Sequence, residues 1–189
     1  MSLCKTVSNP EASNNLIIVM GVSGCGKSTL ASALAEHYHY MCLDADDFHS
    51  DESRTMMAQG TPLTDQQRGP WVASIQHYLQ EQAKLGKSAV LAFSGLKSKH
   101  RAVLRETGLR TIFLFLNGQK KTIEQRMTER LNHFMPPKLL DSQFESLEHP
   151  LDENDVYSID IEKKLDEVIG QAKEIINQNL LQTQCSPTL

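Results

Sequence analysis

The sequence has no hydrophobic run long enough to cross a membrane. Its apolar segments have the length of strands and fall short of the roughly 20 residues that a bilayer span requires. Residues 1–15 are polar and lack the basic start and apolar middle of a secretory signal. Basic charge is also scarce, because 19 Lys and Arg residues stand against 23 Asp and Glu residues, for a net charge of −4. The chain therefore has no general attraction for nucleic acid or an anionic membrane, and we expect a cytoplasmic protein with neither as a partner.

Cysteines are few and far apart. The four cysteines form no CxxC pair, which argues against both a zinc site and a disulfide framework. They are Cys4, Cys25, Cys42 and Cys185. Cys25 lies within a glycine-rich stretch, where it either senses oxidation or fills a small space. The second interpretation is the simpler one, because nothing in the sequence indicates a low thiol pKa.

The remaining composition is ordinary for one soluble globular domain. The chain has 189 residues, of which 40% are hydrophobic and 22% charged, so it can bury a full core. Asn-Pro and Asn-Asn pairs near the start and a proline near the end discourage regular structure there. We expect a flexible leader at 1–14, a single domain at 15–180 and a flexible tail at 181–189.

Apolar runs of strand length alternate with segments of helical periodicity. We expect strands at 16–20, 41–43, 88–93, 111–116 and 156–161. Helices are expected at 27–38, 50–59, 64–86, 97–106, 119–130, 136–147 and 165–176. This alternation predicts the α/β class, with a five-stranded parallel sheet between two layers of helices. Ligands of such sheets bind beyond the carboxyl ends of the strands.

The clearest motif is the phosphate-loop pattern G-x-x-x-x-G-K-S at residues 21–28, between the first expected strand and the first helix. Its glycines let successive backbone N–H groups converge on a phosphate, and the helix N-terminus adds positive charge. Lys27 is expected to reach the β- and γ-phosphates, and the Ser28 hydroxyl to bind Mg²⁺. The alternatives are a chance glycine-rich turn or a dinucleotide site. The second needs a GxGxxG spacing that is absent, and it has no use for the lysine. The motif predicts that a nucleoside triphosphate binds to Gly21, Val22, Ser23, Gly24, Cys25, Gly26, Lys27, Ser28 and Thr29.

An acidic cluster follows the second expected strand. Asp44, Asp46 and Asp47 would lie beside the terminal phosphate, where transfer to an alcohol needs Mg²⁺ and a carboxylate that holds the attacking hydroxyl. Because side chains alternate along a strand, Asp44 and Asp46 would share a face. We assign Asp44 to the Mg²⁺ shell and Asp46 to the acceptor hydroxyl. The alternative is a solvated acidic loop.

Two basic pairs lie at helical spacing near the same edge. Arg126 and Arg130 are four residues apart, so they share a helix face and could clamp the phosphates from a lid over the nucleotide. Lys97 and Arg101 share another face and could bind an anionic acceptor. Surface basic residues at this spacing are common, so spacing alone leaves both assignments open.

Taken together, these residues resemble the gluconate kinases, a family of small phosphate-loop kinases of sugar acids. The resemblance runs from about residue 17 to 160. Its specific parts are LDADDFH (43–49), PLTDQQRGPW (62–71), SGLK (94–97), HFMPPKLL (133–140) and SQFESLEHP (142–150). The phosphate loop is shared by many nucleotide-binding proteins, whereas the combination of the other stretches is far more specific.

The resemblance implies that ATP phosphorylates D-gluconate to 6-phospho-D-gluconate. It also implies an adenylate-kinase-like core, a helical lid at about 119–147 and a homodimer. Lys27, Asp46, Arg126 and Arg130 become the catalytic candidates, with ATP and Mg²⁺ as cofactors. Candidates for substrate contact are Asp46, Asp47, His49, Arg68, Trp71, Lys97, Arg101 and His133.

The chain departs from the family pattern at Gly95, His100, Gln67 and Asn132, where the family usually has Ala, Tyr, an acid and Gly. Gly95 and His100 lie on the acceptor side and leave substrate preference open. One alternative is therefore a related kinase acting on another sugar acid, shikimate or a nucleoside monophosphate. The other is a nucleotide-switched binding protein without turnover, against which the intact Asp46 argues.

Overall fold

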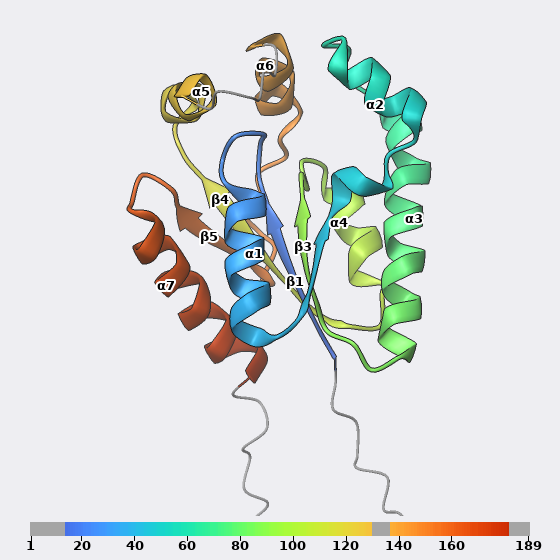
Figure 1. Cartoon of the computed structure of the whole chain (residues 1–189), viewed down its shortest axis with the longest axis vertical. Helices are drawn as coiled ribbons and strands as arrows, with labels where there is room; N and C mark the ends of the chain where they lie inside the picture. Colours follow the sequence, from blue (N-terminus) through green and yellow to red (C-terminus); the bar gives the residue numbers. More distant parts are fainter. Residues whose placement is uncertain (1–13, 130–136, 182–189) are drawn as a thin grey trace, which may run out of the picture.

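The computed structural model describes residues 14–129 and 137–181. Within them the chain forms one five-stranded sheet in the order β2-β3-β1-β4-β5 (Figure 1). All neighbouring strands are parallel. The strands are β1 (Asn15–Met20), β2 (Met41–Asp44), β3 (Ala89–Phe93), β4 (Arg110–Asn117) and β5 (Val156–Asp160). The predicted parallel α/β sheet is thus confirmed, with strand bounds within two residues of those expected.

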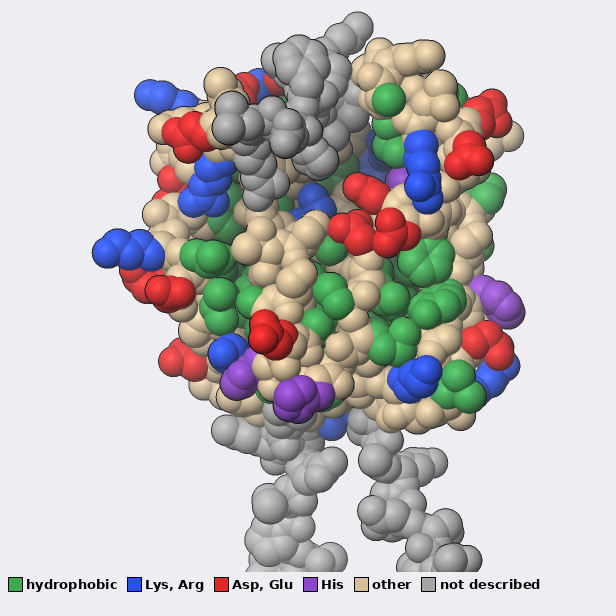
Figure 2. Space-filling model, in the orientation of Figure 1, with side chains coloured by type: hydrophobic (Ala, Val, Ile, Leu, Met, Phe, Trp, Pro, Cys, Tyr) green, Lys and Arg blue, Asp and Glu red, His purple; other side chains and the backbone are tan. Residues whose placement is uncertain are grey.

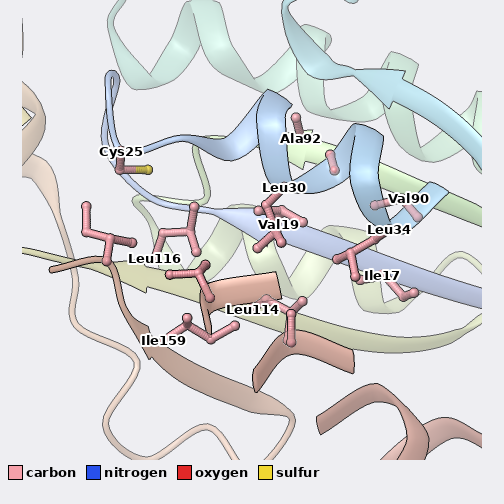
Figure 3. Packing of buried hydrophobic residues seen from close by; sticks show 14 of the residues in the cluster. Ile17, Val19, Cys25, Leu30, Leu34, Val90, Ala92, Leu114, Leu116 and Ile159 are labelled. Atoms are coloured by element: carbon pink, nitrogen blue, oxygen red, sulfur yellow. The ribbon is translucent and has the colours of Figure 1, made fainter. Parts of the chain in front are cut away.

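Helices cover both faces of the sheet, because the central strand presents apolar side chains on both sides. Ile17 and Val19 of β1 pack in one cluster with Leu30 and Leu34 (Figure 3). Leu16, Ile18 and Met20 pack in the other cluster. The first cluster is completed by α1 (Lys27–Tyr38) and α7 (Leu165–Ile176), and the second by α3 (Asp65–Lys84) and α4 (Ser98–Arg105). A strand buried on both faces reads as a continuous apolar run, which is why the sequence marked it so clearly.

The long helix α3 begins at Asp65, one residue after the expected start at residue 64. The Thr64 hydroxyl accepts from the Gln67 N–H while the Gln67 side chain accepts from the Thr64 N–H, which completes a capping box. This start places Arg68 and Trp71 in the first two turns of the helix, at the carboxyl edge of the sheet.

Three further helices lie beyond the carboxyl ends of the strands (Figure 1). They are α2 (Asp51–Ala58), α5 (Lys120–Glu129) and α6 (Pro137–Ser146). An ion pair between Lys120 and Asp141 joins α5 to α6. In the described ranges, no helix is both long enough and apolar enough to span a bilayer.

Candidate functional site

The phosphate loop connects β1 to α1 through backbone conformations that favour glycine. Gly24 has a φ of 81°, and a Cβ added there would lie 2.5 Å from Cγ of Met127 in α5. Gly26, with a φ of 103°, is the N-cap of α1 and supplies no capping oxygen. The N–H groups of the first turn are therefore left for a ligand, and the helix dipole favours an anion.

Lys27 and Ser28 hold positions that suit a bound triphosphate. Lys27 Nζ donates a hydrogen bond of 3.0 Å to the Val22 carbonyl, so the ammonium lies over its own loop. Ser28 Oγ donates to Asp44 Oδ2 at 2.9 Å, which brings the two predicted metal ligands together. A hydroxyl and a carboxylate are the hard oxygen donors that Mg²⁺ takes in proteins, so these residues fit that ion.

Asp46 does not continue the strand, so the expected alternation with Asp44 is wrong. β2 ends at Asp44, whose Oδ1 accepts from the Asp46 N–H at 3.0 Å and caps a short 3₁₀ helix, η1 (Ala45–Phe48). An Asp side chain that binds the backbone two residues on favours a turn over an extended strand. Asp46 nevertheless reaches the carboxyl edge of the sheet, where its side chain is 84% exposed.

A pocket at that edge contains several of the predicted substrate residues. Figure 2 shows acidic and basic side chains gathered around a hollow at this end of the molecule. We call this pocket the acceptor pocket. It is lined by Asp46, His49, Met57, Pro62, Leu63, Arg68, Trp71, Ser94, Leu96, Ser142 and Gln143. Asp47 is exposed and is not among these residues.

Buried contacts hold the aromatic wall of the acceptor pocket in place. The Trp71 indole donates to the Ala45 carbonyl at 2.7 Å, and the His49 ring stacks on it with centroids 4.2 Å apart. Burial lowers the pKa of His49, although Asp46, 3.8 Å away, pulls it upward. His49 Nδ1 is buried without a hydrogen-bond partner in the described part of the chain.

Arg68 is the cation of the acceptor pocket. Burial lowers the pKa of its guanidinium, and the charge of Asp65 partly offsets this shift. Among the described residues, no carboxylate or carbonyl pairs with Arg68, unlike the other arginines of this region. A half-buried guanidinium that makes no direct hydrogen bond or ion pair within the described residues is suited to bind a carboxylate or phosphate.

Arg101 is not available to a substrate, contrary to the sequence-based prediction. Its side chain is 1% exposed, and Nη1 donates to the Gly95 carbonyl at 2.6 Å. Its other nitrogens bind the Glu148 carbonyl and the Glu153 carboxylate. Buried and fully engaged, this guanidinium fixes the segment after α6 to the loop after β3.

Lys97 is also paired. Its Nζ lies 3.2 Å from Glu148 Oε1, and Ser98 donates to the same carboxylate through both N–H and hydroxyl. The Ser98 hydrogen bonds, followed by Lys97, lower the pKa of Glu148 to about 2. Gly95 and His100, the departures from the family pattern on this side, are buried and do not line the acceptor pocket. Gly95 has a φ of 61°, and an added Cβ would lie 2.7 Å from Sδ of Met20.

A second pocket adjoins the phosphate loop on the side of α7, and we call it the nucleotide pocket. It combines an apolar floor with two basic side chains. Arg126 of α5 lies at its edge, where Nη2 donates to the Ile161 carbonyl at 2.6 Å. The pocket is lined by Gly24, Cys25, Gly26, Thr29, Leu30, Leu116, Arg126, Ile161, Lys163, Leu165 and Val168. Arg130 and His133, the remaining predicted site residues, lie outside the described residues.

Cys25 packs beside Leu116 under the loop (Figure 3) and is 2% exposed. Burial raises the pKa of its thiol, against the opposing charge of Lys27. A buried thiol of raised pKa reacts slowly with oxidants, so the geometry favours the filler interpretation.

Gln143 lies in the stretch 142–150 that resembles the gluconate kinases, but the sequence predicts no role for it. The Gln143 Oε1 accepts a hydrogen bond of 2.6 Å from the Ser23 N–H of the phosphate loop. The partners are 120 residues apart in the chain, so no local pattern could have revealed the contact.

This arrangement defines a class of protein. A phosphate loop, a nucleotide pocket and an acceptor pocket at the carboxyl edge of a parallel sheet are the parts of a phosphate-loop kinase of small molecules. Residues 16–150 match the family model described as an AAA domain.

Comparisons with known proteins narrow the class. The chain is 34% identical over 173 residues to the thermoresistant gluconokinase of Escherichia coli, covering 91% of this chain and 99% of that one. It is 39% identical over 155 residues to a gluconokinase of Gluconobacter oxydans, covering 82% and 87% of the two chains. The solved gluconokinase of Sinorhizobium meliloti matches with a TM-score of 0.80 at 35% identity, covering 89% and 94%. The chain belongs to the gluconokinase family.

More distant structures share the fold alone. The APS kinase of Mycobacterium tuberculosis matches with a TM-score of 0.61 at 18% identity, over 88% of this chain and 98% of that one.

Proposed function

We propose that the protein is a gluconokinase, which transfers the γ-phosphoryl group of ATP to D-gluconate and releases 6-phospho-D-gluconate and ADP. The observation that carries this proposal is the acceptor pocket, where the carboxylate of Asp46 and the guanidinium of Arg68 line one space beside the phosphate loop. D-Gluconate matches both groups, because it has a carboxylate at one end and a hydroxyl at the other. The names of the relatives support the same substrate.

Transfer would be direct and in line. The acceptor hydroxyl oxygen forms a bond to the γ-phosphorus, the bond from that phosphorus to the β,γ-bridging oxygen breaks, and the hydroxyl proton passes to Asp46. The loop amides, Lys27 and the predicted lid arginines Arg126 and Arg130 stabilise the charge that develops on the phosphoryl oxygens. Mg²⁺ held by Ser28 and Asp44 would offset phosphate charge when bound.

On the acceptor side, Arg68 would hold the substrate carboxylate, and His49 and Trp71 would form the wall beside the sugar chain. Asp47, Lys97 and His133 remain predicted substrate contacts. A lid at about 119–147, a homodimer and a cytoplasmic location are further parts of the proposal, carried by the family resemblance.

The experiment is ADP release with MgATP and D-gluconate, run beside shikimate, other sugar acids and AMP. We expect turnover that depends on gluconate and is abolished by Lys27→Ala. Turnover only with another acid would keep the kinase and replace the substrate. Tight ATP binding without turnover on any acceptor would instead indicate a nucleotide-switched binding protein.

A further inference from the structure

The contact between α6 and the phosphate loop occupies a group that the nucleotide needs. The Ser23 N–H belongs to the loop whose amides are expected to bind phosphate, and in this structure it donates to Gln143 Oε1 at 2.6 Å. A phosphate oxygen and an amide oxygen accept the same hydrogen bond, so they compete for this donor.

The position of Gln143 identifies which phosphate would compete with it. Gly24, Gly26 and Thr29 of the loop line the nucleotide pocket, whereas Gln143, the partner of Ser23, lines the acceptor pocket with Asp46. A second hydrogen bond joins the phosphate loop to the acceptor pocket. The Gly21 N–H donates to the carbonyl of Ser94, which also lines that pocket. A triphosphate that enters from the nucleotide pocket therefore reaches Ser23 with its terminal phosphate.

We propose that Gln143 is a positioning residue that holds the Ser23 N–H until the γ-phosphate of ATP replaces its amide oxygen. ADP has no phosphate at this point and leaves the contact intact. The exchange releases Gln143 into the acceptor pocket only when the transferable phosphate is present, so the pocket wall responds to ATP and not to ADP. This inference rests on the proposed kinase function for the identity of the nucleotide.

The test is the dissociation constants of MgATP and MgADP, measured by calorimetry on the full chain without acceptor. In Gln143→Ala the competing oxygen is gone, and we expect MgATP to bind about three- to tenfold more tightly, the worth of one net hydrogen bond, with MgADP changed less than about twofold. Gln143→Glu keeps the accepting oxygen and adds a negative charge, so MgATP should bind about tenfold more weakly or worse.

Gln125→Ala is the matched control, because it removes an exposed amide from α5 that, within the described residues, donates a hydrogen bond to the neighbouring Glu129 and touches neither pocket. It should bind both nucleotides as the wild type does. Unchanged or weaker MgATP binding by Gln143→Ala, or an equal change for MgATP and MgADP, would overturn the inference. Unchanged MgATP binding by Gln143→Glu would also overturn it, and this variant decides the question if Gln143→Ala does not fold.

Failure of the inference and failure of the proposed function are distinguishable. If the wild type releases ADP in a gluconate-dependent reaction while the Gln143 variants bind nucleotide normally, only the role of Gln143 is lost. If the wild type binds neither nucleotide, both are lost.

Discussion

The phosphate loop takes its groups from one unbroken segment, residues 21–29, whereas the acceptor pocket gathers side chains from segments as far apart as Asp46 and Gln143. We expect backbone N–H groups to do most of the binding in the loop, so its requirements are conformational and concern glycine. In the acceptor pocket we expect side chains to bind the ligand. Each must be oriented by its neighbours, as the Ala45 carbonyl orients the Trp71 indole by accepting its hydrogen bond. The difference predicts that nucleotide binding withstands most substitutions around the acceptor pocket, while acceptor binding depends on single charged groups.

The largest effect is expected from Asp46→Asn, which should slow phosphoryl transfer and leave nucleotide binding intact. Asp46→Asn retains shape but cannot take the hydroxyl proton, so we expect kcat to fall by about 10²- to 10⁴-fold. The dissociation constant of MgATP should stay within about twofold, since Asp46 does not line the nucleotide pocket. Steady-state kinetics and calorimetry measure both quantities. Near-normal turnover in this variant would remove Asp46 from the mechanism.

Arg68→Gln should weaken binding of the acceptor and leave binding of the nucleotide unchanged. Loss of a charge-assisted pair with the substrate carboxylate is expected to raise KM for gluconate about 10- to 100-fold, with KM for ATP unchanged. Lys84→Gln is the matched control, because it removes the same charge from the exposed end of the same helix. A comparable rise in the control would assign the effect to net charge and not to a bound carboxylate.

Arg101→Met should affect folding more than binding. It leaves Glu153 short of one partner and removes the donors to the Gly95 and Glu148 carbonyls. Breaking such a buried network by removing one partner costs about 3 kcal/mol in the free energy of unfolding. Lys99→Met on the same helix breaks an exposed pair with Asp65 and should cost less than about 1 kcal/mol. Urea unfolding compares them, and equal costs would show that the network is not a structural anchor.

These cases show where sequence reasoning reached the structure and where it did not. The strands, the start of α3 near Thr64 and the phosphate loop follow from local signals, because each is encoded within a short run of residues. Arg101 was misassigned because its partner Glu153 lies 52 residues away, and helical spacing does not tell a solvated cation from a buried one. The strand alternation predicted for Asp46 is wrong because a short apolar run does not fix where a strand ends. Here the Asp44 side chain caps η1 and ends the strand.

The smallest effect concerns the pH dependence of the acceptor pocket. Burial holds the pKa of His49 below its usual value, and Arg54 and Arg68 act in the same direction while Asp46 opposes them. The unfolded chain therefore binds the proton more readily than the folded one. The contribution of neutral His49 to the free energy of unfolding is present above the unfolded pKa of about 6.5 and is lost as the pH falls below it.

The free energy of unfolding of His49→Gln should fall less between about pH 7.5 and pH 5 than that of the wild type, because the titrating group is gone. The variant should also be less stable at both pH values, because the stacking on Trp71 is lost. His77→Gln, at an exposed histidine of α3, is the control for the general effect of removing an imidazole. Urea unfolding at both pH values measures the difference. If the free energy of unfolding of His49→Gln falls between the two pH values as much as that of the wild type, the buried imidazole is not the cause of the loss of stability in acid.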